Sequence, residues 1–188
     1  MLRIVAAVAA VLLAGFALVA PAAPLPRQSP EFSIVEPGGA TILLSSLKGK
    51  VVVVEFLFVK SEHCLRVVRM LEKLHGELGS RGFQPVAVVF DPPNTSVEGR
   101  LLAAQMTEYF KLTFPVGYTS KENVDSYLAR ARNETLSIPQ IVVIDRMGMI
   151  RATTGGRGAD ATLEDESTLR GLLAKLLDEG SSPGTAGK

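Results

Sequence analysis

One run of eight residues constrains the fold of this chain more than any other feature. Residues 51–58 read Val-Val-Val-Val-Glu-Phe-Leu-Phe, which is almost entirely apolar and rich in β-branched and aromatic side chains. A strand that is apolar at successive positions, and not only at alternate ones, is covered on both of its faces. The run therefore predicts a central strand in a sheet that carries other layers on each side.

Helix and strand patterns alternate after this run. Residues 62–80 repeat apolar side chains at helical spacing, with Arg, Lys and Glu on the other face, and residues 85–90 repeat the pattern of a buried strand. Before the run, residues 32–35 and 41–44 flank a Pro-Gly-Gly turn and predict a hairpin. The remaining predicted elements are a helix over 97–110, a short strand within 113–118, a helix over 122–132, a hairpin of 141–144 with 149–153, and a closing helix over 163–177. This order predicts an α/β sandwich around a mixed sheet.

Composition limits the classes of function. The 188 residues suffice for one domain, and 20 Lys and Arg against 19 Asp and Glu leave a net charge of +1, which argues against a nucleic-acid partner. A single cysteine excludes an intramolecular disulfide and a cysteine-rich zinc site. The two histidines, His63 and His75, are too far apart to share a helix face, so no metal site and no cofactor are predicted. Ser45 and Lys48 have a Ser-x-x-Lys spacing, but they lie in a turn before a strand and do not predict a nucleophile.

The N-terminus has the pattern of an export signal. Arg3 precedes an uncharged apolar stretch over residues 4–20, and small residues follow at the spacing that signal peptidase needs. Residues 1–22 are therefore predicted to be a signal peptide, which places the protein in the periplasm or another extracytoplasmic space. The competing interpretation is an uncleaved membrane anchor, although residues 4–20 as a helix span about 25 Å, slightly less than a bilayer core of about 30 Å.

Two further segments are predicted to lie outside the domain. Residues 23–30 are rich in proline and polar side chains, which is typical of a linker, and residues 180–188 have the composition of a disordered tail. The folded domain is then expected over residues 31–179.

The order of elements resembles the thioredoxin-like superfamily. Within it, the chain resembles the exported redoxins of the alkyl hydroperoxide reductase/thiol-specific antioxidant and thiol–disulfide reductase group. The resemblance covers nearly all of residues 31–179 and rests on residues 46–50 (Ser-Leu-Lys-Gly-Lys), 112–116 (Leu-Thr-Phe-Pro-Val) and 137–148 (Ser-Ile-Pro-Gln-Ile-Val-Val-Ile-Asp-Arg-Met-Gly). It implies a thioredoxin-like three-layer sandwich with an N-terminal β-hairpin extension. It also implies a cis peptide bond before Pro139, facing the redox residues.

The chain departs from this family at the position that matters most for its chemistry. The family places Cys-x-x-Cys at the start of the first core helix, where this sequence has Ser61-Glu-His-Cys64. A serine hydroxyl cannot form a disulfide, so dithiol–disulfide turnover within one chain is chemically impossible. Ser61 is suited to cap the helix by accepting a hydrogen bond from the N–H of Cys64. We prefer the cap over a serine nucleophile, because His63 is too near in sequence to be placed as its base.

Two interpretations of Cys64 stay open. In a thioredoxin-like alignment it is the second, shielded cysteine and behaves as a small inert hydrophobe. In a peroxiredoxin-like alignment it is the peroxide-attacking cysteine, and Ser61 supplies the hydroxyl that orients the peroxide. The second alignment lacks two of the family's residues, because its proline is Leu57 here and its arginine aligns with Pro139. Glu62 also opposes a thiolate by like-charge repulsion.

These observations predict an exported redox protein that acts on thiols, disulfides or peroxides through Cys64, with Ser61 and Pro139 beside it. Its substrate would be a thiol or disulfide protein or a peroxide. An external thiol would be needed to reduce a sulfenic acid or a mixed disulfide at Cys64. Membrane contact is expected only if residues 4–20 are an uncleaved anchor. The alternative is a non-catalytic module that holds an extended partner segment in the groove beside the same residues.

Overall fold

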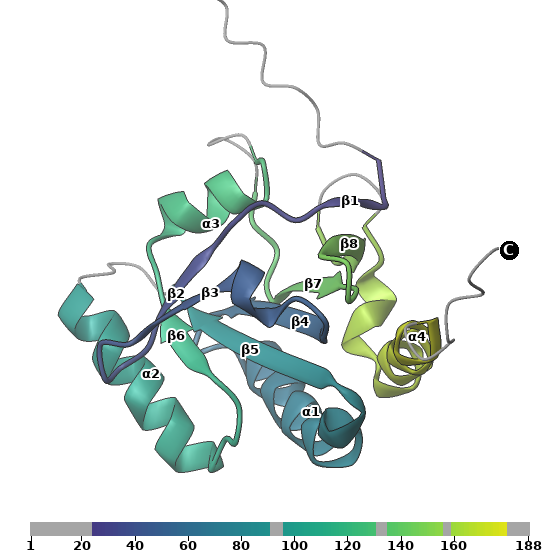
Figure 1. The fold of residues 1–188 in the computed structure, drawn as a ribbon. Coiled ribbons are helices and arrows are strands. Elements are labelled where there is room, and N and C mark those ends of the chain that lie inside the picture. The colour runs from purple at the N-terminus through teal and green to yellow at the C-terminus, as the bar shows by residue number, and fades with distance from the viewer. Residues whose placement is uncertain (1–23, 91–95, 131–134, 156–158, 180–188) are drawn as a thin grey trace, which may run out of the picture.

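The computed structural model describes residues 24–90, 96–130, 135–155 and 159–179 (Figure 1). The predicted signal peptide and the predicted C-terminal tail lie outside these residues. Within the described part, no helix combines the length and the apolar composition that crossing a membrane requires.

A single mixed sheet forms the middle layer. Its eight strands in the described residues follow the order β1-β8-β7-β4-β5-β6-β2-β3. The predicted central strand is β4 (Val51–Leu57), which pairs in parallel with β5 (Phe83–Val89) and antiparallel with β7 (Gln140–Ile144). The other strands are β1 (Arg27–Gln28), β2 (Ser33–Val35), β3 (Thr41–Leu43), β6 (Val116–Tyr118) and β8 (Met149–Thr153).

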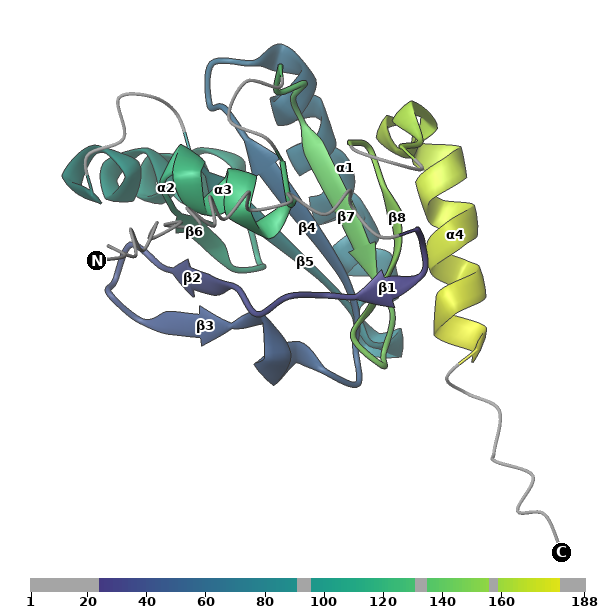
Figure 2. The same cartoon turned by 90° about the horizontal axis from the view of Figure 1, so that it is seen from above.

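Every residue of β4 is buried, which confirms the prediction of a strand covered on both faces. Its alternate side chains enter two separate cores: residues 51, 53 and 57 enter one and residues 52, 54 and 56 enter the other. The helices α1 (Glu62–Leu78), α2 (Ser96–Phe110) and α4 (Glu166–Glu179) line the first core. The helix α3 (Lys121–Tyr127) and the hairpin of β2 and β3 close the second (Figures 1 and 2).

The helix α1 follows β4 after a short turn, and its first turn contains the segment Ser61-Glu-His-Cys64. Seven of its residues are buried, and they recur at helical spacing as the sequence predicts. Gly79 continues into a short 3-10 turn, and Gly82 ends it with φ of +97°, a conformation that other residues rarely adopt. On its outer face, Lys73 and Glu77 form ion pairs with Glu166 and Arg170 of α4, which fix the two helices side by side.

Three details differ from the expectations. The closing helix is divided into a 3-10 turn, η3 (Ala161–Glu164), and α4, because Asp165 is extended and accepts a hydrogen bond from the N–H of Thr168 at 3.0 Å. The helix predicted over 122–132 ends at Tyr127. Residues 27 and 28 of the expected linker instead form β1, which pairs with the edge strand β8. An unpaired sheet edge favours such pairing because it offers a row of backbone donors and acceptors.

Candidate functional site

The first turn of α1 is built around Ser61. Its φ and ψ of −92° and 115° are those of an extended residue, and its Oγ accepts a hydrogen bond from the N–H of Cys64 at 3.4 Å. The Ser61 carbonyl oxygen accepts from the N–H of Leu65 at 3.0 Å. The predicted N-cap is therefore confirmed, and the position that would hold an attacking cysteine holds a helix-capping hydroxyl.

Cys64 is closed off from solvent. Its exposed fraction is 0%, and it lies in the core that α1 shares with α2 and α4. This placement agrees with the interpretation of a shielded thiol. An attacking thiolate must meet its substrate directly. Cys64 can do so only if the first turn of α1 opens.

Pro139 lies in the loop that leads into β7. The peptide bond between Ile138 and Pro139 is cis, as the resemblance implies. Thr154 holds this loop to β8, since its Oγ1 donates to the Pro139 carbonyl oxygen at 3.2 Å and accepts from the N–H of Ile141 at 2.8 Å. Ile138 is half-buried and packs against both cores. Among the described residues, its backbone N–H and C=O have no hydrogen-bond partner.

Glu55 is a further candidate that the sequence analysis did not single out. It lies on the central strand with an exposed fraction of 0%, and neither carboxylate oxygen has a hydrogen-bond partner among the described residues. Since residues 53 and 57 of β4 enter the core that contains Cys64, Glu55 points to the same face of the sheet. The sequence did contain a signal that could have identified Glu55, because it is the one charged residue in the run 51–58.

Burial raises the pKa of Glu55 well above its ordinary value, and the negative charge of Glu164 on η3 raises it further. Glu164 reaches the surface, where its Oε2 lies 3.5 Å from Nδ1 of His63. The same nitrogen of His63 lies 2.9 Å from Arg66. A buried carboxyl without partners is costly for the fold, so it marks a candidate for proton transfer within the core.

The two histidines do not approach each other in a shared site. Nδ1 of His75 lies 3.0 Å from Oγ1 of Thr113, whereas His63 contacts Arg66 and Glu164. No group of three or more His, Cys, Asp or Glu residues suited to a metal ion occurs in the part of the chain that the structure describes.

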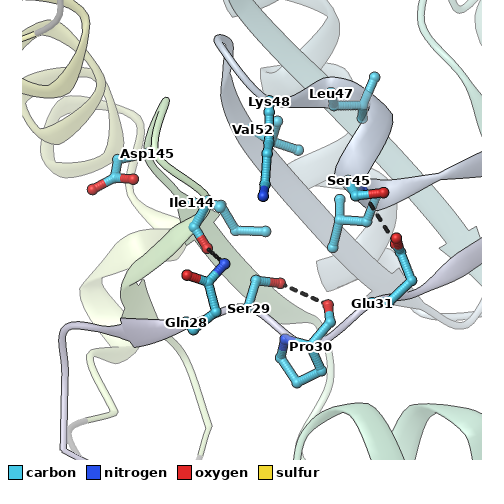
Figure 3. A pocket seen from close by; sticks show the side chains of 12 residues that line it. Gln28, Ser29, Pro30, Glu31, Ser45, Leu47, Lys48, Val52, Ile144 and Asp145 are labelled. Atoms are coloured by element: carbon cyan, nitrogen blue, oxygen red, sulfur yellow. Dashed lines mark hydrogen bonds between the residues drawn. The ribbon is translucent and has the colours of Figure 1, made fainter.

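A small pocket lies far along the sheet from Cys64. It has a volume of about 140 Å³ at the opposite end of β4, where Val52 lies, and Lys48 extends into it (Figure 3). Ser45 also lines it, but its backbone N–H donates to Glu31 at 3.1 Å, and its side chain helps to lower the pKa of the same carboxyl. Ser45 therefore contacts Glu31, and the structure gives no support for Ser45 and Lys48 as a catalytic pair.

Comparisons with known proteins agree with this architecture. A family model described as the AhpC/TSA family matches residues 26–153. The chain belongs to the AhpC/TSA family. It is 27% identical over 132 residues to the thiol-disulfide oxidoreductase ResA of Halalkalibacterium halodurans, an alignment that covers 69% of this chain and 68% of that protein.

Solved structures show the thioredoxin-like fold directly. A thiol:disulfide interchange protein of the thioredoxin family from Chlorobium tepidum superimposes with a TM-score of 0.64 at 20% identity, covering 83% of this chain and 99% of the other. The thioredoxin domain of a thiol-disulfide oxidoreductase from Bacteroides vulgatus gives a TM-score of 0.60 at 20% identity, covering 79% and 96%. The predicted α/β sandwich is confirmed, with the N-terminal hairpin joined to the main sheet through β6.

The buried Glu55 should make the stability of the protein fall as the pH rises. An unfolded chain releases this proton near the ordinary pKa of 4.5, whereas the folded chain retains it to a higher pH because the folded pKa is raised. In this window the folded state binds one more proton, so the free energy of unfolding falls by about 1.4 kcal/mol per pH unit. The stabilising effect is therefore complete below pH 4.5 and is lost as the pH rises through the folded pKa.

We expect Glu55→Gln to remove this dependence and to raise the urea midpoint at neutral pH. The measurement is urea unfolding of both proteins across acidic and neutral pH. Glu62→Gln, which neutralises an exposed carboxylate at the start of α1, is the matched control and should keep the wild-type dependence. Parallel pH curves for wild type and Glu55→Gln would contradict the raised pKa.

Proposed function

We propose that this protein is an extracytoplasmic thioredoxin-fold module that binds extended segments of thiol or disulfide proteins and does not by itself exchange their disulfides. The observation that carries the proposal is the first turn of α1, where a hydroxyl takes the attacking position and the sole thiol is buried. Export is supported by the signal-like pattern of residues 1–22.

The chemistry of exchange explains why turnover is excluded. A thiolate must attack a disulfide sulfur and form a mixed disulfide, which a second thiol then resolves. Ser61 can supply neither thiol. In the thioredoxin-like alignment Cys64 takes the place of the resolving thiol, and the sequence has no other thiol to make the first attack.

The loop at Pro139 supports a binding role. Ile138 offers a backbone donor and an acceptor that no other described residue uses, next to a cis bond that Thr154 helps to hold in place. An extended segment can add to such a backbone as a strand, with affinity from main-chain hydrogen bonds and specificity from side-chain contacts. Phe58 and Leu136, both half-buried, supply apolar surface in the same core region as Ile138.

Binding through the backbone of Ile138 is tested by removing its N–H. We expect Ile138→Pro to weaken the binding of an extended peptide with serine in place of cysteine by about tenfold, because one main-chain hydrogen bond is lost. Ile138→Val keeps the N–H and should bind as wild type does. Calorimetric titration measures both, with circular dichroism to confirm folding. Equal affinities for the two variants would overturn this binding mode.

A second candidate function is single-thiol redox chemistry, and Glu55 is the observation that favours it. A carboxylate on the same core face could accept the proton of Cys64 as the first turn of α1 opens. The thiolate would attack a peroxide oxygen, break the O–O bond and become a sulfenic acid, while the other oxygen takes the proton held by Glu55 and leaves as water or an alcohol. One external thiol would then form a mixed disulfide with Cys64 and release water, and a second external thiol would free Cys64 by forming a disulfide with the first.

Alkylation of Cys64 decides between the two candidates. For the binding module we expect iodoacetamide to label Cys64 only after urea unfolding, because the thiol is buried. Cys64→Ala supplies the baseline. Rapid labelling of the native protein, together with peroxide consumption above that of Cys64→Ala, would favour the redox candidate instead.

Introducing a thiol at position 61 tests whether the rest of the site can support disulfide exchange. Ser61→Cys places a thiol at the N-cap, where helix N-termini lower thiol pKa values and favour attack. We expect this variant to reduce insulin with dithiothreitol about tenfold faster than wild type. The control is Ser61→Cys combined with Cys64→Ala, which lacks the resolving thiol and should accumulate mixed disulfides. No gain in a folded Ser61→Cys protein would contradict a site that lacks only its attacking thiol.

A further inference from the structure

A groove of about 720 Å³ lies between α1 and α2, and the proposed function makes no use of it. Val59 and Leu65 line the groove near the start of α1, and Leu102 and Met106 line it on α2. Small-molecule sites have volumes in this range and are lined mainly by apolar side chains, with a few polar groups that fix orientation. The groove is therefore a candidate ligand site.

Helical spacing arranges the lining of this groove in rows. Leu102, Met106 and Phe110 follow one another at intervals of four residues on α2, so they form an apolar row about 12 Å long. Leu65 and Arg69 have the same spacing on α1. Arg69 meets Phe110 at one end of the row, where its guanidinium carbon lies 4.8 Å from the ring centroid. The groove thus has a cation at one end and apolar walls along the rest of its length.

Arg69 is suited to bind an anion. The ring of Phe110 holds its guanidinium in one orientation by a cation–π contact. Within the described residues, Arg69 forms no ion pair and no hydrogen bond. A guanidinium presents its N–H donors as a planar fork that matches the two oxygens of a carboxylate.

The remaining polar lining lies away from this cation. Glu108 also lines the groove, but at 100° per residue it lies about 160° from Phe110 around α2. Gln105, which is exposed, lies between Glu108 and the apolar row. A negative head group beside Arg69 and Phe110 therefore avoids the carboxylate of Glu108.

We propose that this groove binds a free aliphatic carboxylate of medium chain length. The chain lies along the row from Leu102 to Phe110, and the carboxylate pairs with Arg69. The two main walls are helices, whose backbone groups are hydrogen-bonded internally, so the groove does not favour an added strand. This site goes beyond the proposed function, because Ile138 is not among its lining residues.

A ligand in the groove would also lie against residues that cover the thiol. Val59, Leu65, Leu102 and Phe110 all pack against the core that contains Cys64. A ligand that binds only the closed form stabilises it by mass action. Occupation of the groove should therefore slow the opening of the first turn of α1.

Calorimetric titration with sodium decanoate tests the site. We expect wild type to bind decanoate with a dissociation constant below about 1 mM. Arg69→Gln should weaken binding about tenfold or more, because a charge-assisted pair is lost. Arg66→Gln is the matched control, since Arg66 is also exposed on α1 but contacts His63 and does not line the groove.

The apolar row has its own pair of variants. Leu102→Asn should weaken decanoate binding, whereas Leu101→Asn changes a neighbouring, exposed side chain outside the groove and should leave it unchanged. Circular dichroism confirms that each variant is folded. In mild urea, decanoate should slow the labelling of Cys64 by iodoacetamide in wild type but not in Arg69→Gln.

Three results would overturn the proposal. The first is folded wild type that does not bind decanoate at millimolar concentration. The second is equal affinity for decanoate and 1-decanol, which would show that Arg69 does not recognise the carboxylate. The third is binding of a leucine tripeptide without binding of decanoate, which would assign the groove to a protein segment instead.

Discussion

The fold depends on the burial of β4 on both faces. Its side chains enter two cores in alternation, one lined by α1, α2 and α4 and the other by α3 and the hairpin of β2 and β3. Burying apolar area on this scale is the dominant favourable contribution to folding. It also fixes where β4 ends, and so where α1 and its first turn begin.

The same burial sets the chemistry near Cys64. A strand covered on both faces takes any polar side chain it carries into the core, and for Glu55 the result is a carboxyl that has no hydrogen-bond partner in the part of the chain that the structure describes. Such a group destabilises the folded state at neutral pH, which natural proteins tolerate mainly at functional sites. Its position on the sheet face that packs against the core of Cys64 is the feature that keeps single-thiol chemistry as a second candidate.

The AhpC/TSA family supplies the scaffold, and the first turn of α1 decides how it is used. Ser61 stands where the family has its attacking cysteine, and it keeps the structural role of an N-cap because its hydroxyl accepts a hydrogen bond from the N–H of Cys64. Ser61 cannot replace that cysteine in disulfide exchange, because a hydroxyl cannot form a disulfide. The cis bond before Pro139 remains, so the loop to which we assign the binding of a partner segment persists without the attacking thiol.

The sequence alone determined the order of elements, the central strand and the cap at Ser61, because hydrophobic periodicity and capping chemistry are local properties. The cis bond before Pro139 was predicted from the resemblance and not from periodicity. Only the tertiary structure decided that Cys64 is sealed and that Glu55 shares its core, because burial depends on elements far apart in sequence. The strand β1 and the divided closing helix were also missed. They arise from pairing at a sheet edge and from one side-chain cap, which apolar patterns do not report.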